Sequence, residues 1–504
     1  MIRIFGPPGT GKTTTLLNHV EKLLADGVKA NEIGYFAFTK KASNEARDRA
    51  VARFNLDPEK DFLFFRTLHS MAFQSLGLSS ADVLKESHLK EFSEKVGVNL
   101  VDGVEISEDE GFVTFRSNHP IMRAIDLART TLHGPRWAYN NTDLLEPFYH
   151  FEHIFNEYES FKEANHLTDF TDMLSKLAAS PELVPKLKVV FLDEAQDLTP
   201  LQWEIAHILN SKCERMYIAG DDDQGIFGWN GAEIKKFINL EGSSEVLSQS
   251  YRVPWKVFEL ANRIVNRIRT RQKKEWSPRA EKGSVRMVSD HYGIDFSDQW
   301  LIMAQANYML NDIAYFLKSQ GYYFERYNSP SLSKKVRSAI STWDYLSKGN
   351  NREASLKEVE NLYKHISSED GRLKRGSKNL LKSSNPHDLF TMGLLKEHFG
   401  LEAEGGWEQV LDRIKDEDRA YATAMIKRGV DLNSKPQIKL STVHGAKGGE
   451  ADNVFLILDL TTKALEQLAR NPDDAHRVLY TGITRTKQNL LLKEPQDLMR
   501  GWMV

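Results

Sequence analysis

The sequence predicts an α/β protein of two lobes with parallel sheets, each lobe interrupted by a mostly helical insertion. Short apolar runs alternate with helical patterns over residues 1–70 and about 187–247, which is typical of parallel strands connected by helices. A second alternating set covers 283–324 and returns over 438–492. The expected domains are a first lobe at 1–70 and 166–248, its insertion at 71–165, a second lobe at 249–327 and 436–504, and its insertion at 328–435.

The first apolar run, Met1 to Phe5, leads directly into a phosphate-binding loop. The loop has a complete G-x-x-x-x-G-K-T pattern, and its residues are Gly6, Pro7, Pro8, Gly9, Thr10, Gly11, Lys12 and Thr13, with Thr14 after them. Glycines let the backbone curl so that its N–H groups face phosphates, and the following helix adds the positive end of its dipole. We expect Lys12 to reach the β- and γ-phosphate oxygens and the Thr13 hydroxyl to hold Mg²⁺. The sequence therefore predicts a nucleoside triphosphate site.

Two adjacent carboxylates follow a second buried strand, Lys188 to Leu192. We expect Asp193 to hold the Mg²⁺ shell and Glu194 to orient and deprotonate the attacking water. A lone Asp-Glu pair is more often a solvated strand end, but the strand before it and the phosphate loop upstream favour the catalytic interpretation. A third strand, Arg215 to Ala219, leads to Gln224, whose amide can hydrogen-bond both water and the γ-phosphate.

Two arginines far from the phosphate loop in sequence, Arg252 and Arg485, could be presented by a second lobe as fingers for the transferring phosphoryl group. An arginine at any one site is more often a surface residue. These two arginines indicate a catalytic role only as part of a larger pattern.

That pattern is a series of nine short motifs spread over nearly the whole chain. They are Gly6–Thr13, Phe38–Ala42, Thr67–Ser70, Asp169–Asp172, Asp193–Gln196, Gly220–Ala232, Gln249–Arg252, Thr442–Glu450 and Leu479–Thr486. In this order they resemble the motif series of superfamily 1 DNA helicases of the UvrD/Rep/PcrA group. Each motif alone is weak evidence for this group, but nine motifs in the right order are specific to it.

The resemblance implies an ATP-dependent DNA helicase with two RecA-like lobes around ATP and Mg²⁺, which moves on single-stranded DNA with 3′ to 5′ polarity and meets duplex junctions. By resemblance, the DNA contacts are Phe38, Thr39, His69, Phe227, Trp229 and His444. Core packing is the common alternative for an aromatic residue, although the setting of Trp229 favours stacking on a base. A basic segment, Arg372 to Lys378 with Lys382, is expected either to contact duplex phosphates or to be a solvated face.

Other functions stay open at this point. Among motors, the chain could be the motor subunit of a helicase-nuclease or a translocase activated by an accessory protein. From other classes, it could be a P-loop kinase or a nucleotide-gated binding module, although the motifs around Glu450 and Arg485 argue against both.

The chain departs from the family pattern in two places. Only five residues precede the phosphate loop, so we expect a compact version without the usual adenine-reading glutamine. Base recognition would then rest on stacking by Tyr251, with Glu450 accepting from the ribose hydroxyl. Asn230 stands where the family has an arginine, which could weaken one link between the ATP and DNA sites.

Composition agrees with a multidomain motor. The chain has 504 residues and a formal net charge of -3, so DNA contact must come from a local surface and not from a global basic field. One cysteine, Cys213, excludes an internal disulfide framework and favours a reducing compartment such as the cytoplasm. No run approaches about 18 apolar residues, so no membrane span is expected.

Overall fold

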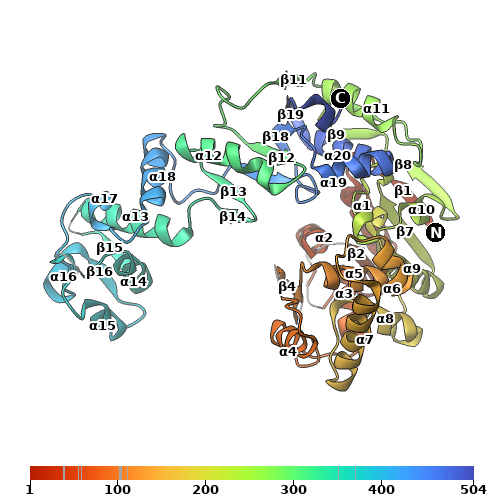
Figure 1. Cartoon of the computed structure of the whole chain (residues 1–504), viewed down its shortest axis with the longest axis horizontal. Coiled ribbons are helices and arrows are strands. Elements are labelled where there is room, and N and C mark those ends of the chain that lie inside the picture. Colours follow the sequence, from red (N-terminus) through yellow and green to blue (C-terminus); the bar gives the residue numbers. More distant parts are fainter. Residues whose placement is uncertain are drawn as a thin grey trace. The chain divides into compact units, whose positions relative to one another are not determined.

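The computed structural model describes residues 1–37, 40–54, 56–57, 60–101, 105–109, 112–349, 351–368 and 371–504. Packing divides the chain into two compact units (Figure 1). The first contains Met1–Glu281 and Gln467–Thr484, and the second contains Lys282–Glu466 and Arg485–Val504. Among the described residues, no helix has the length and apolar character needed to cross a membrane.

The first unit is built on a six-stranded parallel sheet with the strand order β3-β2-β6-β7-β1-β8. The strands are β1 (Ile2–Phe5), β2 (Ile33–Ala37), β3 (Phe65–Thr67), β6 (Val189–Leu192), β7 (Arg215–Gly220) and β8 (Ser243–Val246). Strand β7 lies between β1 and β6, with Phe5 opposite Gly220 and Leu192 opposite Ile218. Since all strands are parallel, their carboxyl ends meet along one edge.

Both faces of this sheet are covered, because the strands alternate apolar side chains toward two hydrophobic clusters. Phe5 and Leu192 pack with α3 (Leu68–Ser75), α8 (Phe170–Ala179) and α9 (Pro200–Lys212) on one face. Ile4 and Phe191 pack with α1 (Lys12–Ala25) and α2 (Lys40–Phe54) on the other. The predicted parallel α/β class is confirmed here.

Residues 84–167 enclose a hydrophobic cluster of their own. Its helices are α4 (Glu86–Val96), α5 (Pro120–Thr130), α6 (Gly134–Asn140) and α7 (Phe148–Ala164), and α5, α6 and α7 lie side by side in Figure 1. An antiparallel hairpin, β4 (Glu105–Asp109) and β5 (Phe112–Arg116), interrupts them. The segment is mostly helical, as expected, but the sequence did not predict the hairpin.

The first unit extends past residue 248. It also contains α10 (Ile234–Ile238), β9 (Gln249–Pro254), α11 (Trp255–Val265), β10 (Ser277–Arg279) and α20 (Pro472–Ile483). Helix α20 packs on α11, and the Arg477 guanidinium donates to the Asp222 carbonyl at 2.9 Å. Packing assigns residues 249–281 and 467–484 to this unit, but packing by itself does not define the lobes. The lobe boundaries expected from the sequence therefore stay a prediction.

The second unit contains a seven-stranded sheet with the order β11-β19-β18-β12-β17-β13-β14, in which only β14 is antiparallel to its neighbour. The strands are β11 (Ser284–Val288), β12 (Trp300–Ala304), β13 (Phe324–Arg326), β14 (Ser329–Pro330), β17 (Ile438–Thr442), β18 (Ala451–Ile457) and β19 (Thr486–Lys493). This is the second predicted parallel sheet. Helix α12 (Asn311–Ser319) packs against the same hydrophobic cluster as β12.

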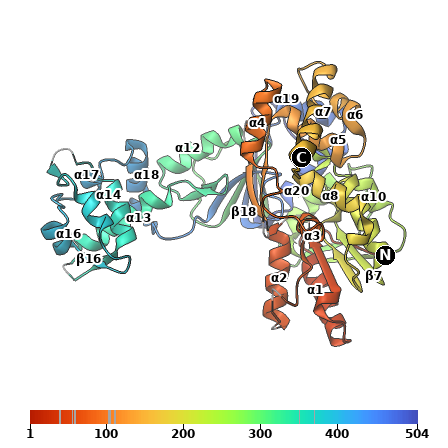
Figure 2. The ribbon, with the colours of Figure 1, turned by 90° about the horizontal axis from the view of Figure 1, so that it is seen from below.

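Within the second unit, the segment between β14 and β17 is mostly helical, as predicted. A small hairpin, β15 (Glu353–Ser355) with β16 (Leu389–Thr391), lies among its helices (Figures 1 and 2). The helices are α13 (Lys334–Ser347), α14 (Leu356–Lys364), α15 (Ser377–Lys382), α16 (Met392–His398), α17 (Trp407–Val410) and α18 (Asp416–Lys427). After β18 the chain forms α19 (Thr462–Arg470).

Short 3₁₀ helices complete the described secondary structure. Those that carry candidate site residues or line the pocket described below are η3 (Ala195–Asp197), η4 (Asp222–Gln224), η5 (Gly228–Asn230) and η6 (Asn307–Leu310). The others are η1 (Ala30–Glu32), η2 (Pro181–Leu183) and η8 (Leu498–Arg500).

Candidate active site

The phosphate loop connects the carboxyl end of β1 to α1. It is anchored on the neighbouring strand, where the Gly6 N–H donates to the Gly220 carbonyl at 2.9 Å. The Lys12 side chain folds back over the loop and its ammonium donates to the Gly6 carbonyl at 3.1 Å. A Cβ on Gly6 would lie 2.0 Å from Lys12 Cγ, so only glycine fits beneath this lysine. Gly11, with φ 78°, forms the N-cap of α1 and has no side chain to cover the first helical N–H groups.

A hydroxyl and a carboxylate meet beside the loop. The Thr13 hydroxyl donates to Asp193 Oδ2 at 3.3 Å, and the Tyr35 hydroxyl donates to the same oxygen at 2.7 Å. Asp193 is 2% exposed. Burial and the neighbouring Glu194 charge raise the pKa of Asp193, and burial raises the pKa of Tyr35 well above its ordinary value. Oxygen ligands of this kind suit Mg²⁺.

Glu194 adopts a left-handed backbone conformation, with φ 56° and ψ 40°. Such a conformation is costly for a residue with a Cβ and tends to be retained at functional positions. The Glu194 carboxylate lies 3.8 Å from the Lys12 ammonium and accepts a hydrogen bond of 2.5 Å from the Gln196 amide. The sharp turn therefore directs the proposed base toward the phosphate loop.

Gln196 also ties the ends of β6 and β7 together, a role that the sequence did not predict. Its Oε1 accepts from the Asp221 N–H at 2.9 Å, and a Cβ on Gly220 would lie only 2.5 Å from that oxygen. Three residues after Asp221, the Gln224 amide donates to Asp221 Oδ2 at 2.5 Å. The two candidate water-orienting groups, Glu194 and Gln224, thus share one hydrogen-bonded framework.

Three consecutive aspartates, Asp221, Asp222 and Asp223, lie close enough together to surround a metal ion, but the chain supplies its own cation there. The Lys274 ammonium lies 2.9, 2.5 and 2.8 Å from their respective carboxylates. Arg271 donates to both oxygens of Asp223 at 2.7 Å. Lys274 and Arg271 could not be predicted from the sequence, because about fifty residues separate them from the aspartates and nothing in the local pattern marks them.

Strand β9 is docked on the phosphate loop. The Ser250 hydroxyl donates to the Pro8 carbonyl at 2.7 Å, and the Tyr251 N–H donates to the Gly9 carbonyl at 2.8 Å. A Cβ on Gly9 would lie 2.3 Å from Arg252 Cβ. The structure therefore places Tyr251 and Arg252 beside the loop within the first unit, whereas the sequence assigned both to the second lobe.

The aromatic candidates for DNA contact differ in their surroundings. Trp229 is 48% exposed, its ring is 6.3 Å from that of the half-buried Phe227, and the Arg123 guanidinium lies 5.2 Å from its centroid. The half-buried His69 stacks on Phe170 with ring centroids 3.5 Å apart. Two further candidates, Phe38 and Thr39, lie outside the described residues.

The remaining candidates belong to the second unit. Glu450 and Arg485 immediately precede β18 and β19, whose first residues are paired. Arg485 is buried and donates to the Gly449 carbonyl at 3.3 Å, while Glu450 forms an ion pair of 2.7 Å with Lys487. His444 is half-buried after the carboxyl end of β17.

Three side chains of the basic segment bind partners within the second unit. Arg372 pairs with Asp412 at 2.5 Å, Lys374 with Glu402 at 3.3 Å, and Lys378 donates to the Ile366 carbonyl at 3.2 Å. These contacts support a structural role for a segment that the sequence left open.

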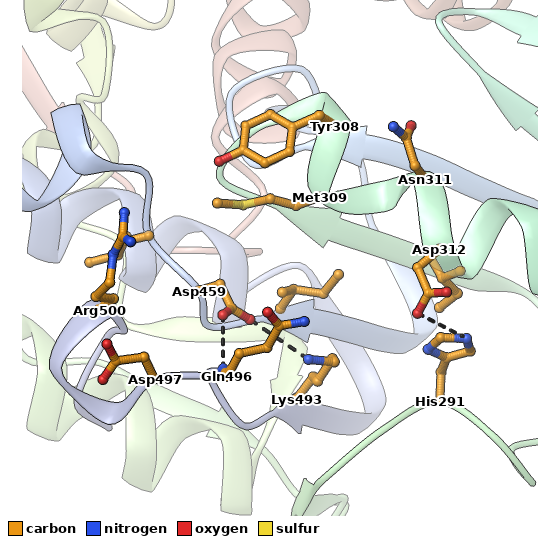
Figure 3. A pocket seen from close by; sticks show the side chains of 13 residues that line it. His291, Tyr308, Met309, Asn311, Asp312, Asp459, Lys493, Gln496, Asp497 and Arg500 are labelled. Carbon is orange, nitrogen blue, oxygen red and sulfur yellow. Dashed lines mark hydrogen bonds and ion pairs between the residues drawn. The ribbon is translucent and has the colours of Figure 1, made fainter.

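A separate pocket of about 480 Å³ lies in the second unit, beyond the carboxyl ends of β12, β18 and β19 (Figure 3). It contains the ion pair of Asp459 with Lys493 at 3.7 Å and the buried His291, 3.9 Å from Asp312. None of the predicted site residues lines it.

Comparison with known proteins gives two matches to family models. A model of the UvrD/REP helicase N-terminal domain matches residues 1–245, and one of the UvrD-like helicase C-terminal domain matches residues 319–495. Relatives include a probable DNA helicase of Mycoplasma pneumoniae, which is 25% identical over 61% of this chain and 62% of that protein. The ATP-dependent DNA helicase Rep of Buchnera aphidicola is 24% identical over 52% of this chain and 40% of that protein.

A third relative matches almost the whole chain. The ATP-dependent DNA helicase UvrD2 of Mycobacterium tuberculosis is 24% identical over 96% of this chain and 75% of that protein. By contrast, the chain spans 62% and 40% of the length of the first two relatives.

Proposed function

Since the chain belongs to the UvrD/Rep family of superfamily 1 helicases, we propose that it is an ATP-dependent DNA helicase that moves 3′ to 5′ on single-stranded DNA and separates duplex DNA. One observation carries the proposal. The Thr13 hydroxyl lies 3.3 Å from Asp193 while the Lys12 ammonium lies 3.8 Å from Glu194, so groups suited to metal, phosphate and water meet at one sheet edge.

Binding of ATP begins at the phosphate loop. The backbone N–H groups of Gly9 and of Gly11 to Thr14, at the amino end of α1, form an anion site, and the Lys12 ammonium neutralises phosphate charge. Thr13 and Asp193 would hold Mg²⁺, which when bound neutralises further charge on the phosphates. Tyr251 lies beside the loop and is 72% exposed. Its ring would stack on the base, and Glu450 would accept a hydrogen bond from the ribose hydroxyl.

Hydrolysis then depends on groups that orient water and stabilise charge. Glu194 would accept the proton of the attacking water, and the Gln224 amide would hydrogen-bond the water or the γ-phosphate. Arg252 and Arg485 would stabilise the charge that develops on the transferring phosphoryl group. The framework through Gln196 and Asp221 supports the first two roles, because it fixes both side chains before any substrate arrives.

DNA would be gripped by stacking and by polar contacts. Trp229 is the strongest candidate, because a large aromatic side chain that is about half exposed offers a face to a base. Phe38 and Phe227 are proposed to stack as well, and Thr39, His69 and His444 to contact the strand. ATP-dependent closing and opening of the two lobes would move the strand in steps.

The test combines ATP hydrolysis with strand separation. We expect single-stranded DNA to stimulate hydrolysis, and the protein to unwind a duplex with a 3′ single-stranded tail but not one with a 5′ tail. Lys12→Ala serves as the inactive control. Stimulated hydrolysis without unwinding would favour a translocase that needs an accessory protein. Hydrolysis that does not respond to DNA would overturn the proposal.

A further inference from the structure

Lys274 is a fully enclosed cation of the first unit that the proposed mechanism does not use. Its side chain is 0% exposed, and its ammonium lies 5.7 Å from the centroid of Phe5, the last residue before the phosphate loop. Burial lowers the pKa of Lys274, but the charges of Asp221, Asp223 and Asp222 outweigh burial and hold the pKa above its ordinary value. The ammonium therefore stays charged within the fold.

The contacts of Lys274 lead directly to both candidate water-orienting groups. Its ammonium donates to Asp221 Oδ1 at 2.9 Å, while the other oxygen of that carboxylate accepts from Gln224 at 2.5 Å. The Asp221 N–H donates to Gln196, and the Gln196 amide donates to Glu194. A single buried residue, Asp221, thus connects Lys274 to Gln224 through its side chain and to Glu194 through its backbone.

Burial by itself would favour a neutral Asp221. Burial raises the pKa of this carboxyl, but the charges of Lys274 and Lys12 and the hydrogen bonds from Lys274 and Gln224 together outweigh burial, so the pKa lies below its ordinary value. The ionised carboxylate accepts from the lysine at one oxygen and from the glutamine amide at the other, and its charge strengthens both hydrogen bonds. Loss of the lysine would leave an uncompensated buried charge, which either takes up a proton or rearranges.

We propose that Lys274 is a positioning residue for ATP hydrolysis. Its ammonium fixes the Asp221 carboxylate, which holds the Gln224 amide. Through Asp221 the lysine also anchors the end of β7, and this end of the strand holds Gln196 against Glu194. The inference rests on the proposed function. It assigns to Lys274 an effect on the chemical step rather than on nucleotide affinity, since the lysine reaches Asp221 and not the phosphate loop backbone.

Arg271 provides a matched control within the same cluster. It is a largely buried cation and pairs with Asp223 through two hydrogen bonds of 2.7 Å, but it makes none of the contacts with Asp221 described above. Removal of either cation breaks a buried ion pair and should lower stability. Only removal of Lys274 should also disturb Gln224 and Glu194.

The experiment compares Lys274→Met with Arg271→Met in the full chain. The readouts are kcat and KM for ATP, the Kd of a non-hydrolysable ATP analogue, and the melting temperature. We expect Lys274→Met to lower kcat at least about tenfold with Kd changed less than about threefold, and Arg271→Met to keep kcat within about threefold. Both variants should melt at a lower temperature than the parent. Equal kcat values for the two variants would overturn the inference.

A compensated variant keeps the test decisive if Lys274→Met does not fold. Lys274→Met combined with Asp222→Asn removes one negative charge together with the positive one, and Asp222→Asn alone is its reference. Asp222 pairs with Lys274 at 2.5 Å, whereas it is Asp221 that holds the glutamine. We expect the same loss of kcat relative to this reference. A folded double variant that hydrolyses ATP at the reference rate would contradict the positioning role.

A double-mutant cycle with Gln224→Ala tests the route of the effect. If Lys274 acts partly through Gln224, combining Lys274→Met with Gln224→Ala should lower kcat by less than the product of the two single losses. Combining Arg271→Met with Gln224→Ala should lower kcat by the full product of the two single losses. Failure of the proposed function is distinguishable, because the unaltered protein would then either hydrolyse no ATP or hydrolyse it without a response to DNA. Active parent enzyme with fully multiplicative losses for both lysine and arginine variants would instead reject the Gln224 route.

Discussion

The backbone N–H of Tyr251 donates a 2.8 Å hydrogen bond to the carbonyl of Gly9, so β9 is attached to the phosphate loop itself. The neighbouring Ser250 hydroxyl adds a second attachment at the Pro8 carbonyl. Backbone contacts of this kind do not depend on the Tyr251 side chain. Any shift of the loop backbone must therefore move Arg252, which follows directly in the strand.

The close approach at Gly9 predicts that Gly9→Ala abolishes ATP hydrolysis. The new Cβ would lie 2.3 Å from Arg252 Cβ, and the positive φ of 71° adds strain. Gly27→Ala is the control, because Gly27 has a φ of 86° with no atom within 4 Å of its Cβ position. We expect the control to lose only about 1–2 kcal/mol of stability from strain and to keep its activity. Equal hydrolysis by both variants would show that the contact is dispensable.

Glu194→Gln should abolish turnover while ATP still binds. The change removes the proton acceptor but leaves Lys12 in the phosphate loop, where its ammonium is 3.1 Å from the Gly6 carbonyl. Lys12→Ala should weaken both binding and turnover, because it removes a charge that the phosphates need. Equilibrium binding of labelled ATP and steady-state hydrolysis separate the two variants. Hydrolysis by Glu194→Gln at the parent rate would exclude Glu194 as the base.

Trp229→Ala should weaken binding of single-stranded DNA by about 1–3 kcal/mol and reduce DNA stimulation, with basal hydrolysis retained. Trp255→Ala is the control, because Trp255 is 49% exposed compared with 48% for Trp229 but has no predicted role in DNA binding. Fluorescence anisotropy with a labelled oligonucleotide measures the affinity. Equal affinity of the two folded variants would remove Trp229 from the DNA site.

A second buried ionic cluster predicts how stability depends on pH. Asp169 accepts from Arg129 at 2.6 Å, from Lys162 at 2.9 Å and from Tyr158 at 3.0 Å. Burial raises the pKa of Asp169, but the two cations outweigh burial and hold it far below its ordinary value. A lowered pKa in the folded state gives stability that is complete above the unfolded pKa of about 4 and is lost as the pH falls below it.

Asp169→Asn should therefore destabilise the first unit by about 3–5 kcal/mol at neutral pH. The difference from the parent should stay constant between about pH 7 and pH 5 and shrink toward pH 3. Urea unfolding followed by tryptophan fluorescence measures it at each pH. A difference that is unchanged at pH 3 would mean that the Asp169 charge does not contribute.

Local pattern alone determined much of this protein. The phosphate loop, the strands that lead to Asp193 and to Asp221, and the two parallel sheets could all be predicted, because each depends on a short run of sequence with a distinct physical signature. The backbone of a glycine-rich loop and an apolar strand depend little on distant residues. The series of motifs also sufficed to identify the family.

Only the tertiary structure decided which distant groups meet. The placement of Lys274 among three aspartates, of Arg477 on the Asp222 carbonyl and of β9 on the phosphate loop joins segments that are 52, 255 and about 240 residues apart. Nothing in their local sequence marks these partners, because an isolated lysine or serine is compatible with any solvated surface. Their roles arise from burial, since enclosure by the fold forces each charge and each polar group to find a partner.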